Sequence, residues 1–268
     1  MDMVELLRKV AIVPVIKMDC PEHAVPLARA IRRGGLSAVE ITYRSAAAQE
    51  SIRAIADEVP DLFVCAGTVL TPEQAEQAVE AGARAVISPG LNLDTVRWCI
   101  AHEVPVIPGC ATPTEVEMCM REGLSLLKLF PAGIVGGVGM LKALAGPYGA
   151  VQFMPTGGVK PGNVKEYLSQ KNVAACGGTW MVKKDLIEGE KWDEITRICK
   201  DAVKTMLGFS TNPTVILIMI LLIFFIVTMF MESIATLTLF MPILYPIALG
   251  VGCLLYTSPS PRDYAASR

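Results

Sequence analysis

The chain has 268 residues and a formal net charge of −2, with 24 Lys and Arg residues against 26 Asp and Glu residues. This balance gives no indication of a nucleic-acid partner, and the length allows one large domain or two smaller ones. The eight cysteines form no C-x-x-C pair and only two histidines occur, so we expect reduced thiols, no metal site and no cofactor.

The N-terminal segment does not have the pattern of a signal peptide. Residues 1–9 carry charges and contain no apolar core. We therefore expect the first domain to be cytoplasmic.

Short runs typical of β-strands alternate with helical patterns through residues 1–208. The runs cover residues 11–16, 38–42, 63–67, 85–88, 106–109, 126–129, 152–156 and 174–177. Alternating strands and helices predict a parallel sheet. Eight strands with intervening crossovers predict an α/β fold of the (β/α)8 TIM-barrel type, at the small end of its size range. An open doubly wound sheet is the alternative.

Clear start and stop signals mark several of the helices. Residues 71–74 read Thr-Pro-Glu-Gln, with a capping Thr and Pro in the first turn, and Gly82 marks the end of that helix. Residues 112–115 repeat the signal, and Gly123 follows. An earlier helix is expected within residues 19–35.

Polar residues stand near the end of the second expected strand. Val39 and Ile41 are predicted to face the helices, so Glu40, Thr42 and Arg44 should point inward or upward. In barrels of this type the chemistry lies at the carboxyl ends of the strands. This end of the chain's second strand is therefore a candidate functional region.

Lys128 lies in an apolar run that is expected to be the sixth strand. Alternation places Leu126, Lys128 and Phe130 on one face, and both faces should be buried. Burial disfavours an ammonium ion, and a neutral amine is a nucleophile suited to forming a Schiff base with a ketone. The alternative is a lysine that reaches water at the strand end or pairs with a carboxylate.

Two glycine pairs follow the seventh and eighth expected strands. They stand in the segments Thr156-Gly157-Gly158 and Gly177-Gly178-Thr179, each beside a hydroxyl group. Glycine allows close backbone approach, and clustered N–H groups bind phosphate. Loops after these two strands often build phosphate sites in barrels, so we expect one here.

Together these residues indicate a particular kind of substrate. Lys128 supplies a nucleophile, and Glu40 can transfer protons, although a structural salt bridge to Lys128 or Arg44 is the alternative for Glu40. The planar fork of Arg44 suits a carboxylate, unless Arg44 is simply a solvated loop residue. The expected substrate carries a carboxylate, a nearby ketone and a distant phosphate.

Residues 1–207 resemble the class I 2-keto-3-deoxy-6-phosphogluconate (KDPG) aldolases, which are similar to 4-hydroxy-2-oxoglutarate (KHG) aldolases. The segments that carry the resemblance are residues 39–44 (VEITYR), 66–70 (AGTVL), 87–91 (ISPGL), 128–132 (KLFPA), 155–158 (PTGG) and 177–180 (GGTW). Many members have Ser in place of Thr179 and Leu in place of Tyr43.

The resemblance implies a role for each candidate site residue. The catalytic residues would be Lys128 and Glu40; the pyruvate moiety would contact Arg44, Thr68, Pro89 and Phe130; and the phosphate would contact Thr156, Gly157, Gly158, Gly178 and Thr179. The implied products are pyruvate with glyceraldehyde 3-phosphate, or pyruvate with glyoxylate. The resemblance also implies a homotrimer.

Two other functions fit the barrel. One is a different phosphate-binding barrel lyase or isomerase in which Lys128 is not covalent. The other is a non-catalytic, membrane-tethered binding module.

The C-terminal part has a different composition from the rest of the chain. All but two of the 24 basic and all but two of the 26 acidic residues precede Gly208, and residues 215–231 contain Thr228 as the only polar residue. That length and polarity predict a transmembrane-like helix, with a buried soluble helix as the alternative.

The same part resembles two unrelated kinds of sequence. Residues 212–252 resemble a piece of the large membrane subunit of TRAP-type dicarboxylate transporters, and residues 253–268 resemble translated sequencing adapter and should be disordered. We therefore expect an aldolase domain (1–208), an apolar chimeric fragment (209–252) and an artefact-like tail (253–268). Membrane contact is expected only if the apolar segment is genuine, in a membrane-tethered aldolase.

Overall fold

The structure is a computed structural model that describes residues 3–206. The chain divides into two units, Met1–Leu207 and Gly208–Arg268. The predicted apolar segment and C-terminal tail therefore lie outside the described residues. Within residues 3–206, no helix combines the length and the apolar character that a bilayer crossing requires.

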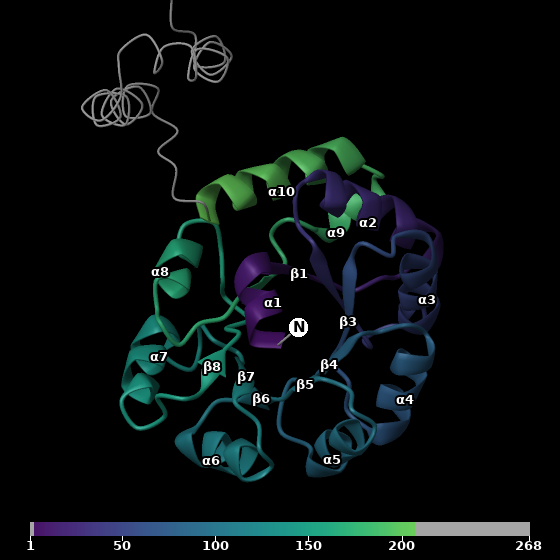
Figure 1. The fold of residues 1–268 in the computed structure, drawn as a ribbon. Helices are drawn as coiled ribbons and strands as arrows, with labels where there is room; N and C mark the ends of the chain where they lie inside the picture. Colours follow the sequence, from purple (N-terminus) through teal and green to yellow (C-terminus); the bar gives the residue numbers. More distant parts are fainter. Residues whose placement is uncertain (1–2, 207–268) are drawn as a thin grey trace, which may run out of the picture. The chain divides into compact units, whose positions relative to one another are not determined.

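Short strands alternate with helices along the described chain (Figure 1). The strands are β1 (Ile12–Ile16), β2 (Ala38–Thr42), β3 (Phe63–Gly67), β4 (Ala85–Ile87), β5 (Val106–Ile107), β6 (Gly109–Cys110), β7 (Leu126–Leu129), β8 (Gln152–Phe153) and β9 (Cys176–Gly178). The helices are α1 (Met3–Val10), α2 (Ala24–Arg33), α3 (Ala48–Glu58), α4 (Pro72–Glu80), α5 (Leu93–Ala101), α6 (Pro113–Arg121), α7 (Gly137–Ala145), α8 (Val164–Leu168), α9 (Lys184–Glu188) and α10 (Trp192–Met206), with a short 3-10 turn at Pro21–His23.

All paired strands run parallel, and the sheet curls round on itself. One part has the order β5-β4-β3-β2-β1-β9 and the other the order β6-β7-β8. Single parallel bridges join Phe153 to Val173 and Thr156 to Gly177, so the segment after β8 reaches the last strand. The α/β fold with a curled parallel sheet agrees with the sequence prediction at this level.

Several strand predictions differ in detail from the structure, and the strand expected at 152–156 is reduced to β8 at Gln152–Phe153. The strand expected at 106–109 is divided by Pro108 into β5 and β6, because proline has no N–H to donate to a ladder. The last strand begins at Cys176 rather than at Ala174. The shorter β8 leaves the site residue Thr156 beyond the strand, in an isolated bridge to Gly177.

The predicted helix signals at 71–74 and 112–115 are confirmed. The Thr71 hydroxyl accepts from the N–H of Gln74, and Thr112 and Glu115 form a reciprocal capping box. Each helix is followed by a glycine with positive φ, Gly82 at +99° and Gly123 at +81°, which is the usual end of a helix.

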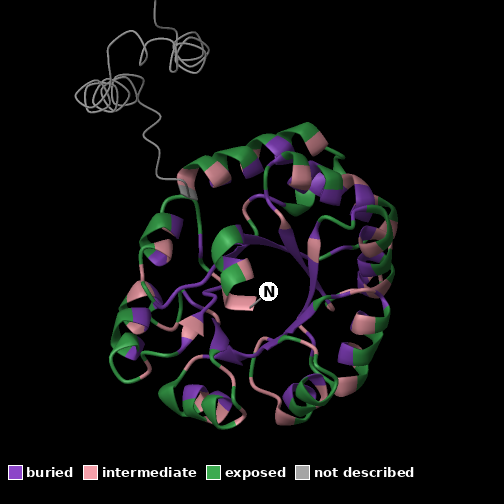
Figure 2. Cartoon of the chain, in the orientation of Figure 1, coloured by how far each residue is buried: buried purple, intermediate pink, exposed green. Residues whose placement is uncertain are grey.

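The apolar residues form two layers on opposite sides of the curled sheet. Figure 2 shows the buried strands as an inner ring with helices outside it. Val39 and Ile41 of β2 pack in the outer layer against the helices, whereas Ala38 lies in the inner layer. This alternation on β2 is the one expected from the sequence.

Helix α1 was not predicted, and it has a clear structural role. Leu7 and Val10 are buried in the inner layer with residues from the starts of the strands. The helix therefore covers the amino end of the curled sheet, which leaves the carboxyl end open for ligands.

Candidate active site

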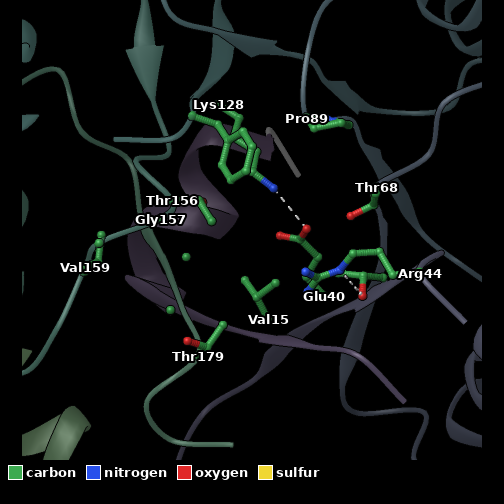
Figure 3. Close-up of a pocket in the computed structure, with 15 residues that line it drawn as sticks. Val15, Glu40, Arg44, Thr68, Pro89, Lys128, Thr156, Gly157, Val159 and Thr179 are labelled. Carbon is green, nitrogen blue, oxygen red and sulfur yellow. Dashed lines mark hydrogen bonds and ion pairs between the residues drawn. The ribbon is translucent and has the colours of Figure 1, made fainter. Parts of the chain in front are cut away.

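A cavity of about 200 Å³ opens at the carboxyl ends of the strands (Figure 3). It is lined by Val15, Glu40, Thr42, Arg44, Thr68, Pro89, Lys128, Phe130, Thr156, Gly157, Gly158, Val159, Gly177, Gly178 and Thr179. Every predicted site residue is in this set. The cavity therefore brings together residues from strands that are far apart in the sequence.

Three lining residues were not proposed from the sequence in any role. Val15 and Val159 are apolar, and Gly177 was noted only as part of a glycine pair. Val15 could have been found, because it lies on β1 at the same level as Glu40 on β2. Thr42 was expected to point inward, and it does.

Lys128 and Glu40 form a buried ion pair across the cavity. Lys128 Nζ lies 3.0 Å from Glu40 Oε1, and the two residues are 4% and 0% exposed. Glu40 Oε2 is also buried and has no hydrogen-bond partner among the described residues. A buried carboxylate oxygen without a partner is costly, so Oε2 is suited to accept a proton or a hydrogen bond from a ligand.

The surroundings of this pair are apolar on one side. Lys128 Nζ lies 5.3 Å from the centre of the Phe130 ring. Cys65, on the inner face of β3, is fully buried, and burial together with the Glu40 charge raises the pKa of its thiol well above the ordinary value. Cys65 therefore stays protonated and is a poor nucleophile.

Arg44 is held in place by the end of its own strand. Its Nε donates to Thr42 Oγ1 at 3.2 Å, and the Thr42 hydroxyl in turn donates to the carbonyl of Ile16 at 2.9 Å. Within residues 3–206 no carboxylate pairs with the Arg44 guanidinium. Its terminal nitrogens are therefore available for an anionic ligand.

Thr68 adds a hydroxyl on the same side of the cavity. Its φ of +55° lies in the left-handed region that non-glycine residues rarely adopt. Figure 3 places Thr68 next to Arg44 and facing the Lys128–Glu40 pair. Backbone strain of this kind is often found at ligand-binding residues.

The two glycine pairs line the opposite side of the cavity. Gly157 and Gly158 have φ values of +89° and +87°, and the Gly157 carbonyl accepts from the N–H of Gly133 at 2.8 Å. A side chain at Gly177 would collide with Thr156, and one at Gly178 would collide with Trp180. Gly157 and Gly158 are thus required by their backbone conformation, whereas Gly177 and Gly178 are required because a side chain has no space there.

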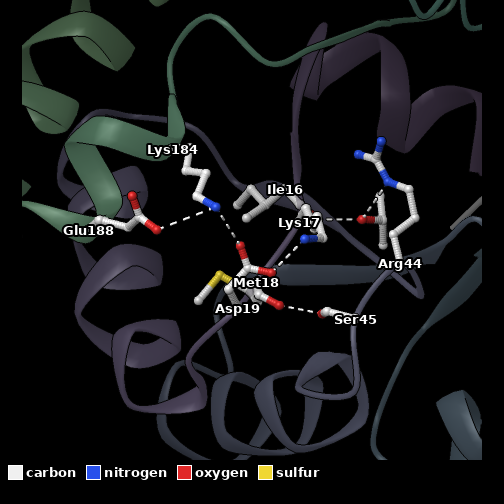
Figure 4. A network of polar contacts seen from close by, with 9 residues as sticks. Ile16, Lys17, Met18, Asp19, Arg44, Ser45, Lys184 and Glu188 are labelled. Carbon is white, nitrogen blue, oxygen red and sulfur yellow. Dashed lines mark hydrogen bonds and ion pairs between the residues drawn. The ribbon is translucent and has the colours of Figure 1, made fainter.

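The loop after β1 is fastened to its neighbours beside the cavity (Figure 4). Asp19 pairs with Lys17 at 2.6 Å and with Lys184 at 3.3 Å, and Lys184 also contacts Glu188 at 3.4 Å. The Ser45 hydroxyl donates to the carbonyl of Met18. These contacts link the loop after β1 to α9 and to the segment that follows β2.

Comparison with protein families gives two matches. The model described as KDPG and KHG aldolase matches residues 3–198. The model of the DctM component of the tripartite ATP-independent periplasmic transporter matches residues 194–254, which agrees with the resemblance noted for that segment.

Named relatives and solved structures cover the first of these regions. The chain is 45% identical over 200 residues to the 2-dehydro-3-deoxy-phosphogluconate aldolase of Treponema pallidum, covering 75% of this chain and 95% of the relative. It is 45% identical over 193 residues to the KHG/KDPG aldolase of Escherichia coli K12, covering 72% and 91%. The crystal structure of KDPG aldolase from Legionella pneumophila, with pyruvate captured as a covalent carbinolamine, superposes with a TM-score of 0.72 at 37% identity, covering 74% of this chain and 97% of that one.

Proposed function

Because the chain belongs to the KDPG and KHG aldolase family, we propose that it is a class I aldolase, a carbon–carbon lyase. It cleaves KDPG to pyruvate and glyceraldehyde 3-phosphate, and 4-hydroxy-2-oxoglutarate to pyruvate and glyoxylate. The observation that carries this proposal is the buried Lys128–Glu40 pair at the mouth of the cavity.

Lys128 is the Schiff-base residue in this proposal. Glu40 Oε1, 3.0 Å from Nζ, can take a proton from the ammonium and leave a free amine. The amine adds to the C2 ketone to give a carbinolamine, whose hydroxyl group takes the proton back from Glu40 and leaves as water, so that an iminium ion forms and Glu40 is again a carboxylate. The Arg44 guanidinium holds the substrate carboxylate with Thr68, while Pro89 and Phe130 pack against the pyruvate moiety.

Glu40 then moves the protons of the cleavage step. It accepts the C4 hydroxyl proton, directly or through a water, while the electrons of the C3–C4 bond pass into the iminium and leave an enamine. The aldehyde product departs, Glu40 returns a proton to C3, and hydrolysis of the resulting iminium frees pyruvate and Lys128.

The phosphate of the larger substrate binds opposite Arg44. Support comes from the left-handed Gly157 and Gly158, the closely packed Gly178, and the hydroxyls of Thr156 and Thr179 on the cavity wall. Backbone N–H groups in such loops are suited to phosphate. With 4-hydroxy-2-oxoglutarate this part of the cavity stays empty.

The proposal also covers the complete fold, the oligomeric state and the location of the protein. We infer a closed (β/α)8 barrel, supported by the bridges that join the segments after β8 to the last strand and by the division of one strand at Pro108. A domain of residues 1–208, a homotrimer and a cytoplasmic location rest on the family resemblance. Residues 209–252 are inferred to be a chimeric fragment and 253–268 an artefact-like tail.

A coupled assay tests the activity directly. Pyruvate released by the purified chain is reduced with lactate dehydrogenase, and NADH consumption is followed with each substrate in turn. We expect turnover of both substrates. Absence of pyruvate release from either one by folded protein would overturn the proposal.

A further inference from the structure

Gly67, at the end of β3, lies directly beside Thr42 in the register of β2 and β3. It does not belong to the glycines with positive φ, so its backbone conformation is open to any residue. Glycine inside a strand weakens it by loss of side-chain packing and by chain entropy. A glycine at this position therefore needs a reason other than backbone conformation.

The reason is the space that the Glu40 side chain occupies. A Cβ atom built on Gly67 would lie 2.5 Å from Glu40 Cγ and 2.7 Å from Cδ, and closer still to Oε1. Real Cβ atoms essentially never lie this close to an atom to which they are not bonded. Any side chain at Gly67 would therefore push the carboxylate out of its observed position.

The Glu40 carboxylate is held in its observed position by burial and by its partner. It is 0% exposed and its Oε1 is held by Lys128. Cys65, the register partner of Glu40 on β3, is buried, and its thiol interacts electrostatically with the Glu40 charge. The side chain thus leans from its own strand over Gly67 toward the mouth.

We propose that Gly67 is a positioning residue that sets the place of the Glu40 carboxylate beside Lys128. The inference rests on the proposed function, because Glu40 must be in reach of C3 and of the C4 hydroxyl. Gly67 itself touches no substrate. Its effect on the reaction passes through Glu40 alone.

The test compares the full chain with Gly67→Ala, Glu40→Asp and the double variant. The readout is exchange of the pyruvate C3 protons with solvent, which needs the proton transfer by Glu40 but no cleavage. We expect Gly67→Ala to slow exchange about 100-fold, the scale of general acid–base catalysis, while borohydride still traps pyruvate on Lys128. In the Glu40→Asp background the same alanine should cost less than about tenfold, because the shorter side chain withdraws from the occupied space.

Gly139→Ala is the matched control, because a Cβ there meets nothing within 4 Å. It should leave exchange unchanged, and thermal unfolding of each variant establishes that it is folded. Exchange by Gly67→Ala at the wild-type rate, equal losses in both Glu40 backgrounds, or loss of the adduct in folded Gly67→Ala would each overturn the inference. So would a crystal structure of Gly67→Ala with the 3.0 Å separation of Glu40 Oε1 and Lys128 Nζ unchanged.

The same design separates this inference from the proposed function. Failure of the wild-type chain to form an adduct would overturn the aldolase assignment, and the catalytic part of the inference with it. The crystal structure of Gly67→Ala would still decide whether Gly67 sets the Glu40 position.

Discussion

Lys128 donates a hydrogen bond to Glu40 across the interior of the curled sheet, although the two residues are 88 positions apart in the sequence. Their strands, β7 and β2, are not neighbours in the sheet. The pair therefore depends on the curl of the whole sheet rather than on local strand pairing. In the proposed mechanism this pair links the nucleophile to the group that moves its protons.

Glu40→Gln should separate Schiff-base formation from proton transfer. The amide keeps the shape of the carboxylate but is not a base, so pyruvate proton exchange should fall at least about 100-fold. Borohydride trapping on Lys128 should persist but build up more slowly, because water must then take the ammonium proton in place of Glu40. Glu50→Gln, an exposed residue on α3, is the control, and wild-type exchange by Glu40→Gln would remove Glu40 from the mechanism.

Thr42→Val should weaken substrate binding more than it slows turnover. The substitution keeps the side-chain shape but removes the hydroxyl that accepts from Arg44 Nε at 3.2 Å. One hydrogen bond to a charged group is worth about 1 kcal/mol or more, so KM should rise at least about fivefold. Steady-state kinetics with Thr114→Val, an exposed residue on α6, as control would show it; a fall in kcat at constant KM would contradict it.

Gly157→Asp should discriminate between the two substrates. A negative side chain at the left-handed Gly157 repels a phosphate, so cleavage of KDPG should suffer far more than cleavage of 4-hydroxy-2-oxoglutarate. Gly123→Asp controls for backbone strain, since Gly123 also has positive φ, at +81°, and has no atom within 4 Å of its Cβ position. Equal losses of kcat/KM for both substrates would refute a phosphate site at Gly157.

Alkaline conditions should destabilise the folded domain through its buried thiols. Burial raises the pKa of Cys110 and of Cys176 to about 12, from an ordinary value of 9.0. Between these pH values the unfolded chain loses the thiol protons while the folded chain keeps them, so the free energy of unfolding falls as pH rises, by about 1.4 kcal/mol per pH unit for each fully shifted thiol.

Urea unfolding of wild type and Cys176→Ala between pH 8 and pH 11 measures this effect. The range starts just below the roughly 9–12 window in which the thiols of the unfolded chain alone lose their protons, and it covers most of that window. The variant should show the shallower fall in stability with pH. Identical slopes for the two proteins would mean that Cys176 does not titrate as its burial implies.

Much of the site could be predicted, because strand alternation determines which side chains point inward and strand order determines which strand ends lie together. Period-two alternation identified the inward side chains of β2, including Glu40, and the position of Lys128 on the sixth predicted strand placed it in the same mouth. The glycine pairs marked the two loops that close the cavity. These features depend on local sequence and on a general rule for parallel sheets.

Other features could not be predicted because they depend on packing between distant segments. Helix α1 is short, and its Leu7 and Val10 make sense only when the amino end of the curled sheet is there to receive them. The space requirement at Gly67 appears only when the Glu40 side chain is placed across the neighbouring strand. The division of one strand at Pro108, by contrast, could have been predicted, because proline has no N–H to donate to a ladder.

Borohydride reduction in the presence of pyruvate tests the covalent role of Lys128 most directly. Reduction of the iminium makes the adduct permanent, and mass spectrometry of the digested protein identifies the modified residue. The account predicts an adduct on Lys128 in wild type and in Lys142→Ala, an exposed lysine on α7, and loss of both adduct and aldolase activity in Lys128→Ala. A folded wild-type protein without the adduct, or an active Lys128→Ala variant, would contradict it.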